Sequence, residues 1–222
     1  MSTGRTHTAT LVARQQIGPG IVELKLSRPS DFVFLPGQYM RFDMGGYQRD
    51  YTVVSAVDAQ TLDFCVAVVE GGRFSHDIMA ADIGGRLSVS GPHGHFVYQG
   101  GAGRSSVFAA TGTGVAPYVA FCRNGVTDAL LLHGVRTPGG LIYGNTLAPA
   151  MRAYVPCISR HRSTHSHPAA MFSGRVTHYL ERQLKPGTYD FYLCGRRAMI
   201  RDATAIIDQR FGDSRLFIET YD

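Results

Sequence analysis

The sequence lacks long apolar stretches and has few charged residues. No segment approaches the roughly 20 apolar residues that a membrane-spanning helix needs. The polar segment Met1–Thr10 also lacks the apolar run of a secretory signal. We therefore expect a soluble, cytoplasmic protein without a membrane span. Hydrophobic residues make up 44% of the chain and charged residues 18%, a composition that excludes wholesale disorder and allows a packed core.

Cysteine is also scarce, and its spacing excludes two kinds of site. The four cysteines are Cys65, Cys122, Cys157 and Cys194. They form no CxxC pair, no iron–sulfur spacing and no pattern typical of a disulfide framework. The histidines His161, His165 and His167 cluster in a polar segment without a neighbouring carboxylate or thiolate, so we predict no metal site there.

Acidic residues are outnumbered by basic ones, and nearly all the basic residues are arginine. Twenty-two basic and seventeen acidic residues give a net charge of +5. The arginines form no basic tract, which argues against a nucleic-acid partner and indicates anionic ligands or an acidic protein partner. An evenly solvated surface is the alternative interpretation, and it accounts for most of these arginines.

The first half of the chain is typical of an antiparallel β-barrel or sandwich. Short runs rich in Val, Ile, Phe, Tyr and Thr recur between Gly and Pro breaks. The predicted strands are Ile21–Leu26, Gln38–Asp43, Arg49–Ser55, Thr61–Val69 and Arg86–Ser90.

A segment of Gly, Ala, Ser and Arg, Tyr98–Ser106, is predicted to link this half to a second domain, with domains at residues 1–101 and 102–222. Beyond it, strands alternate with helices, as in a parallel sheet wrapped by helices. The five predicted strands are Val107–Ala110, Ala129–Val135, Val155–Ser159, Tyr189–Cys194 and Leu216–Thr220. The predicted helices are Ala116–Arg123, Gly174–Leu184 and Arg197–Arg210.

The segment from Thr111 to Pro117 is a candidate phosphate-binding loop. Gly112 and Gly114 follow a predicted strand and open a helix. Glycines allow a tight turn and close approach to a pyrophosphate, whose charge a helix N-terminus stabilises. Pro117 replaces the usual third glycine and suits a first helical turn. A plain strand–turn–helix connection is the alternative.

The ends of the next two predicted strands indicate which dinucleotide would bind. Arg136 follows the second strand, and no acidic residue occurs from Leu131 through Met151. Ser159 and Arg160 end the third strand. Guanidinium groups without an acid suit a 2′-phosphate better than a free 2′-hydroxyl. The alternative is that these arginines are solvated strand ends.

Arg49, Tyr51, Thr52 and Ser55 give one strand of the first half a guanidinium, an aromatic ring and hydroxyl groups. An arginine can neutralise a phosphate, and a ring can cover a flat heterocycle. By composition alone, an ordinary amphipathic strand explains the segment better.

Seven short motifs occur in an order that resembles the ferredoxin–NADP reductase family across nearly the whole chain. They are Pro36-Gly37-Gln38-Tyr39, Arg49-x-Tyr51-Thr52-x-x-Ser55, Gly72-x-x-Ser75, Gly91-Pro92-x-Gly94-x-Phe96, Gly112-x-Gly114-x-x-Pro117, Cys194-Gly195-x-x-x-Met199 and Glu219-x-Tyr221. The resemblance implies an N-terminal FAD-binding antiparallel β-barrel and a C-terminal NADP-binding α/β domain with a five-stranded parallel sheet.

The resemblance also implies site residues. Arg49 would contact the flavin phosphate, Tyr51 the isoalloxazine and Thr52 the flavin N5, while Cys194 would lie at the nicotinamide. For Cys194, a buried strand-end cysteine is the alternative. The implied catalytic residues are Thr52, Cys194, Glu219 and Tyr221. The implied cofactor-binding residues are Arg49, Tyr51, Thr52, Val66, Val68, Gly72, Ser75, Thr111, Gly112, Gly114, Arg136, Ser159, Arg160, Cys194, Gly195 and Tyr221.

The expected function is therefore that of a flavoenzyme with FAD and NADP(H) as cofactors and no metal. It would exchange a hydride with NADP(H) and single electrons with a separate acidic carrier such as ferredoxin or flavodoxin, acting as a monomer. One alternative is a flavin reductase that uses free flavin as a substrate. Another is a non-catalytic dinucleotide-binding subunit of a larger complex.

Overall fold

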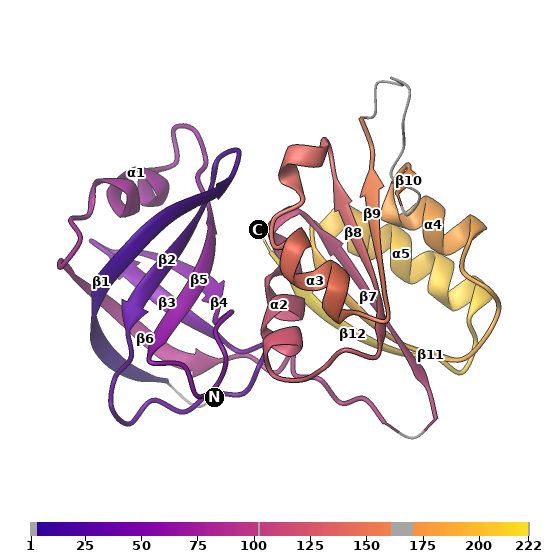
Figure 1. Ribbon diagram of the computed structural model, residues 1–222, viewed down its shortest axis with the longest axis horizontal. Helices are drawn as coiled ribbons and strands as arrows, with labels where there is room; N and C mark the ends of the chain where they lie inside the picture. Colours follow the sequence, from indigo (N-terminus) through magenta and orange to yellow (C-terminus); the bar gives the residue numbers. More distant parts are fainter. Residues whose placement is uncertain (1–3, 102, 161–170, 222) are drawn as a thin grey trace. The chain divides into compact units, whose positions relative to one another are not determined.

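The computed structural model describes residues 4–101, 103–160 and 171–221 (Figure 1). The chain divides into two compact units. The first contains the residues up to Tyr98 together with Ala116–Asn124, and the second contains Gln99–Val115 and the chain from Gly125 onward. The domain boundary between residues 101 and 102 stays a prediction. The histidine cluster at positions 161, 165 and 167 lies outside the described residues.

The first unit is a six-stranded antiparallel sheet with one short helix. Its strands are β1 (Arg5–Gly18), β2 (Ile21–Ser27), β3 (Tyr39–Met44), β4 (Tyr47–Thr52), β5 (Thr61–Ala67) and β6 (Arg86–His93), and its helix is α1 (Arg73–Ala80). The strand order is β4-β3-β6-β1-β2-β5. A bridge between Val53 and Phe64 and a 2.8 Å hydrogen bond from Val54 N–H to the Asp63 carbonyl join the two edges. This unit confirms the antiparallel barrel.

The core of the barrel follows from alternation along its strands. On β2, the side chains of Val22, Leu24 and Leu26 are buried, as period-2 alternation requires. Phe74 and Ile78 of α1 belong to the same apolar cluster. The helix therefore adds its apolar side to the barrel core.

The second unit is a parallel sheet of six strands with helices. Its strands are β7 (Ser105–Thr111), β8 (Ala129–Val135), β9 (Ala153–Ile158), β10 (Phe172–Ser173), β11 (Tyr189–Gly195) and β12 (Arg215–Thr220). Its helical segments are η1 (Gly112–Val115), η2 (Pro138–Gly140), α3 (Gly144–Ala150), α4 (Val176–Arg182) and α5 (Arg197–Arg210). Helix α2 (Ala116–Arg123) follows η1 and belongs to the first unit.

All five predicted parallel strands are present, but the predicted total of five is wrong. The sixth strand, β10, pairs Phe172 with Cys157 and Ser173 with Ile158. Two residues are too few for a periodic pattern, so the sequence gives no signal for this strand.

The order of the strands, β10-β9-β8-β7-β11-β12, places β7 between β8 and β11. From β7 the next strands in sequence, β8 and β9, are added on one side of the sheet. Strands β11 and β12 are added on the other side. In such sheets ligands bind at the carboxyl ends of the strands where this order reverses. Here that point lies between β7 and β11. Helices α4 and α5 lie together on one side of the sheet (Figure 1).

Helix α2 is held within the first unit by specific contacts. The rings of Phe96 and Phe121 stack with centroids 6.0 Å apart. Arg123 donates a 3.0 Å hydrogen bond to the Val54 carbonyl, and Asn124 accepts a 2.9 Å bond from Val57 N–H. The helix that continues the Gly112–Val115 loop is thus anchored to the segment just after β4.

Within the part of the chain that the structure describes, no helix is both long enough and apolar enough to cross a membrane.

Candidate functional site

The loop after β7 packs closely against the end of β11. A Cβ on Gly114 would lie 2.5 Å from the Cys194 carbonyl oxygen, so only glycine permits this approach. A Cβ on Gly195 would clash with the Thr111 hydroxyl, and that hydroxyl accepts a 3.0 Å hydrogen bond from Arg196 N–H. Thr111, Gly114, Cys194 and Gly195, which lie far apart in sequence, are therefore neighbours.

Cys194 and Glu219 stand side by side at the carboxyl ends of β11 and β12, in one register position. Cys194 is fully buried, and burial raises its pKa well above the ordinary thiol value, with the charge of Glu219 adding to the shift. The thiol is thus kept protonated. Tyr221 N–H donates a 3.3 Å hydrogen bond to the Gly195 carbonyl. The structure brings these three predicted residues to one edge of the sheet.

Arg136, Ser159 and Arg160 also lie together, at the carboxyl ends of β8 and β9. Arg160 N–H donates to the Arg136 carbonyl at 2.9 Å, and Ser159 N–H donates to the Val135 carbonyl at 3.0 Å. All three side chains are exposed. Two guanidinium groups and a hydroxyl are thus available to one anionic ligand.

In the first unit, Arg49, Tyr51 and Thr52 lie near the end of β4. Arg49 is exposed, and its guanidinium donates to the Gln48 carbonyl at 2.7 Å. Tyr51 is half-buried, edge-on to Phe42 at 5.4 Å and tilted against Phe74 at 5.5 Å between ring centroids. Burial raises the pKa of Tyr51, so its hydroxyl stays neutral. Thr52 is buried.

The turn with Gly72 and Ser75 leads into α1. A Cβ on Gly72 would lie 2.9 Å from the Val69 carbonyl oxygen, so the turn is too tight for a side chain that cannot shift. The Ser75 hydroxyl accepts a 2.9 Å hydrogen bond from Val69 N–H. Amides in a first helical turn have no acceptor within the helix, which suits an anion.

The two valines implied by the resemblance lie close together in sequence, at the end of β5. Val66 is fully buried within that strand, and Val68 follows it, donating a 2.8 Å backbone hydrogen bond to Gly20. Their place beside the barrel core makes them suited to apolar contact only.

These residues fit the two groups that the resemblance implies. The β4 residues and the start of α1 offer an aromatic ring, a guanidinium and helix amides, as a flavin with its phosphates requires. In the second unit, the open space beside Gly112, where a Cβ would meet nothing within 4 Å, and the two exposed arginines suit a dinucleotide.

Two candidate residues are absent from the sequence-based prediction. The Arg73 guanidinium lies 4.1 Å from the centroid of the Tyr47 ring, at the start of α1. His133 is fully buried in β8 and contacts the loop after β7. Arg73 carries a detectable signal in the sequence, because it stands between Gly72 and Ser75, two of the implied cofactor-binding residues. His133 carries none in its apolar strand.

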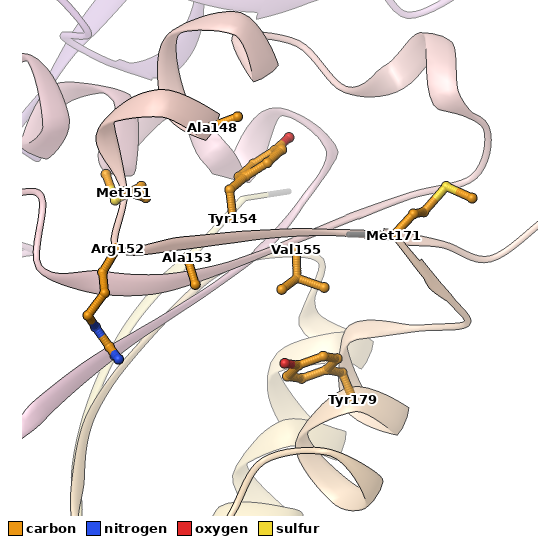
Figure 2. A pocket seen from close by; sticks show the side chains of 8 residues that line it. All are labelled: Ala148, Met151, Arg152, Ala153, Tyr154, Val155, Met171 and Tyr179. Atoms are coloured by element: carbon orange, nitrogen blue, oxygen red, sulfur yellow. The ribbon is translucent and has the colours of Figure 1, made fainter. Parts of the chain in front are cut away.

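A cavity of about 540 Å³ lies beside β9 and α4. Figure 2 shows Tyr154 and Tyr179 on opposite sides of β9 within its lining. None of its eight lining residues belongs to the predicted flavin or dinucleotide set.

Comparison with known families agrees with both halves of this arrangement. Residues 8–98 match the oxidoreductase FAD-binding domain, and residues 108–205 match the oxidoreductase NAD-binding domain. The chain belongs to the ferredoxin–NADP reductase family. It is an oxidoreductase of the flavoenzyme type, with one domain for FAD and one for a nicotinamide dinucleotide.

Relatives of this reductase-family chain include both short and long proteins. It is 29% identical to ferredoxin–NADP reductase B of Sorangium cellulosum, over 96% of this chain and 97% of the relative. It is 30% identical to the toluate 1,2-dioxygenase electron transfer component of Pseudomonas putida, over 90% of this chain but 63% of the relative. The chain thus spans nearly all of the first protein and less than two thirds of the second.

A ferredoxin–NADP⁺ reductase from Neisseria gonorrhoeae, solved with bound FAD and NADP, has the same fold. Its TM-score is 0.82 at 21% identity, covering 97% of this chain and 98% of that one. The two-domain architecture predicted from the sequence is therefore confirmed.

Proposed function

We propose that this enzyme transfers a hydride between NADP(H) and bound FAD and exchanges single electrons with a separate acidic carrier protein of the ferredoxin or flavodoxin kind. The observation that carries the coenzyme assignment is the pairing of Arg136 with Arg160 at the ends of β8 and β9. No acidic residue occurs from Leu131 through Met151 to hold a free 2′-hydroxyl.

FAD, when bound, supplies the conversion between a two-electron hydride and single electrons. The chain's own residues bind and orient the reactants. Arg49 neutralises a flavin phosphate, the Tyr51 ring covers the isoalloxazine, and the Thr52 hydroxyl is proposed to donate a hydrogen bond to the flavin N5.

In the second unit, the Gly112–Gly114 loop receives the pyrophosphate and the exposed Arg136 and Arg160 receive the 2′-phosphate. Cys194 and Glu219 are proposed to lie at the nicotinamide. Because the Cys194 thiol is held protonated by burial, it acts by packing and hydrogen bonding and not as a thiolate.

An acidic carrier is supported by the charge of the chain. The net charge of +5 favours an acidic partner by electrostatic attraction.

Three measurements on the purified protein test the proposal. Acid release and chromatography should find FAD that remains bound through gel filtration. NADPH should reduce it faster than NADH at equal low concentrations, and the reduced protein should reduce an acidic ferredoxin or flavodoxin. Flavin lost on gel filtration would instead indicate a flavin reductase, and absence of dye reduction by NADPH would indicate a non-catalytic module.

A further inference from the structure

His133 is a buried titratable side chain that the proposed chemistry does not use. It lies in β8, in register with Ala110 of β7 and Pro156 of β9, and has no exposed surface. Its two ring nitrogens contact groups 21 residues away in opposite directions along the chain: the Gly112 carbonyl and the Tyr154 hydroxyl.

The partners of His133 fix its proton. Nε2 lies 3.1 Å from the Gly112 carbonyl oxygen, and Nδ1 lies 3.0 Å from the Tyr154 hydroxyl oxygen. A carbonyl oxygen can only accept, so Nε2 carries the hydrogen. Nδ1 of the neutral ring must then accept, and the Tyr154 hydroxyl donates to it. The hydrogen bonds run in one direction, from Tyr154 through His133 to Gly112.

This chain of hydrogen bonds ends on a peptide of the dinucleotide loop. The Gly112 carbonyl and the Thr113 N–H belong to one planar trans peptide, in which the two groups point in opposite directions. Holding the carbonyl against buried His133 therefore turns the Thr113 N–H away from the sheet interior. A hydrogen bond accepted at the carbonyl also strengthens the N–H of the same peptide as a donor.

Packing alone does not fix this peptide. A Cβ on Gly114 would collide with the end of β11, so the second half of the loop is held by close contact. A Cβ on Gly112 would meet nothing within 4 Å, and its φ of +56° lies in the left-handed region that glycine enters freely. The backbone hydrogen bonds of η1 hold the turn itself, and His133 adds a directional contact at the Gly112 carbonyl.

We propose that His133 is a positioning residue for dinucleotide binding: it orients the Gly112–Thr113 peptide so that Thr113 N–H faces the coenzyme pyrophosphate, and Tyr154 holds its tautomer. This rests on the proposed function, since it takes the loop as the pyrophosphate site. Tyr154 also lines the cavity beside β9 (Figure 2).

The test compares NADP⁺ with adenosine 2′-phosphate, which lacks the pyrophosphate, on the FAD-loaded protein. His133→Leu removes both hydrogen bonds and should weaken NADP⁺ binding by about 3- to 10-fold, the equivalent of one hydrogen bond. Binding of adenosine 2′-phosphate should not change. His133→Gln can donate to Gly112 and accept from Tyr154, so it should restore most of the NADP⁺ affinity.

Tyr154→Phe keeps the aromatic ring and removes the hydroxyl that donates to His133 Nδ1. This variant tests the proposal if His133→Leu fails to fold. It should weaken NADP⁺ binding about 2- to 5-fold with flavin content unchanged. Unaltered NADP⁺ binding in both foldable variants overturns the proposal. The proposal is also overturned if His133→Leu weakens the binding of NADP⁺ and of adenosine 2′-phosphate equally and His133→Gln restores neither. That result would indicate a general structural role. If the wild-type protein binds no dinucleotide, the proposed function itself is overturned. If the wild type binds NADP⁺ and the variants bind it equally well, only the role of His133 is overturned.

Discussion

His133 and Cys194 are both fully buried, and burial shifts the pKa of each side chain in the direction that favours its uncharged form. The pKa of His133 falls to about 4, and that of Cys194 rises well above its ordinary value. Around the dinucleotide loop, the charges therefore come from exposed arginines and from Glu219. Buried groups near the loop contribute hydrogen bonds and shape.

The shift at His133 predicts a pH dependence of stability. An unfolded histidine has a pKa near 6.5, whereas His133 in the folded chain titrates at about 4. Between these values the unfolded state binds more protons, so the free energy of unfolding should fall as the pH drops from 6.5 to 4. The contribution of this one group is about 3 kcal/mol.

Urea unfolding of the wild type and of His133→Gln, measured across this pH range, checks the prediction. The difference between the two free energies should be constant above pH 7 and shrink toward pH 4, because glutamine does not titrate. Parallel curves would show that the pKa of His133 is the same in the folded and unfolded chains, which contradicts the prediction.

Arg160 gives a second prediction at the scale of the residue. Arg160→Ala removes the proposed charge-assisted hydrogen bond to the 2′-phosphate, worth about 1.5–3 kcal/mol. NADPH should then bind about 10- to 100-fold more weakly, with NADH binding almost unchanged. Arg182→Ala, an exposed arginine of α4 beside Glu181, is the matched control. If NADPH and NADH lose affinity equally, the assignment of a 2′-phosphate site at Arg160 is wrong.

The closeness of several candidate residues could be predicted, because each stands in a short motif beside a predicted strand end, whereas their roles stay predictions. Cys194 and Glu219, for example, end two neighbouring strands, and parallel register brings them together. His133 could not be predicted, because its two partners are set by the strand order and not by spacing. A histidine within the apolar run Leu130–Leu132 and Gly134 has no periodic signal of its own.

At the scale of the element, long periodic segments were predicted well and irregular ones were not. Helices α2 and α5 have their predicted bounds. Strand β1 was missed, because it is largely polar and has register shifts against β2 that break its alternation. Helix α3 contains Pro149 and starts at a glycine, and α1 follows two glycines, so propensity argued against both.

The end of β12 carries a prediction about coenzyme release. Tyr221 follows the strand, and its N–H continues the ladder to the Gly195 carbonyl. We propose that the Tyr221 ring covers the flavin face that the nicotinamide must reach, so that the ring and the nicotinamide would compete for one position. Removing Tyr221 and Asp222 should tighten NADP⁺ binding, blur the discrimination between NADPH and NADH, and slow turnover.

Removal of Asp222 alone is the control for this truncation, because it shortens the chain and leaves the ring. Calorimetric titration with NADP⁺ gives the affinity, and stopped-flow reduction gives the rate. If the chain ending at Thr220 binds NADP⁺ no more tightly than the control, Tyr221 does not cover the flavin.

At the scale of the whole molecule, α2 is continuous with the dinucleotide loop but belongs to the barrel unit. Arg123 at its end donates to the Val54 carbonyl and lies 3.8 Å from Glu23 and 3.7 Å from Asp63. Lys25 lies between the same two acids, 3.5 Å from Glu23 and 2.7 Å from Asp63. The barrel thus holds this helix by a partly buried cluster of charges.

Arg123→Ala should destabilise the first unit. It removes the bond to Val54 and leaves Lys25 to neutralise two nearly buried carboxylates. The expected loss is about 1 kcal/mol or more, which corresponds to a drop of about 4–8 °C in melting temperature for a folding unit of roughly 100 residues. The increase in flavin fluorescence on heating, when FAD is released, measures the unfolding of this unit. Arg201→Ala, which removes an exposed pair with Asp202, should leave the transition unchanged. A variant as stable as that control would show that Arg123 is dispensable for anchoring α2.

The backbone hydrogen bond between Arg160 and Arg136 has a consequence for the thermodynamics of coenzyme choice. It orders the main chain of both arginines before any phosphate arrives, so binding has to restrict only their side-chain rotamers, at about 0.5–1.5 kcal/mol each. With such a preorganised pair, the difference in affinity between two ligands comes from electrostatic attraction and not from ordering of the loop on binding. The proposed preference for NADP⁺ over NAD⁺ should therefore narrow steadily as the ionic strength rises, with little change in the heat capacity of binding.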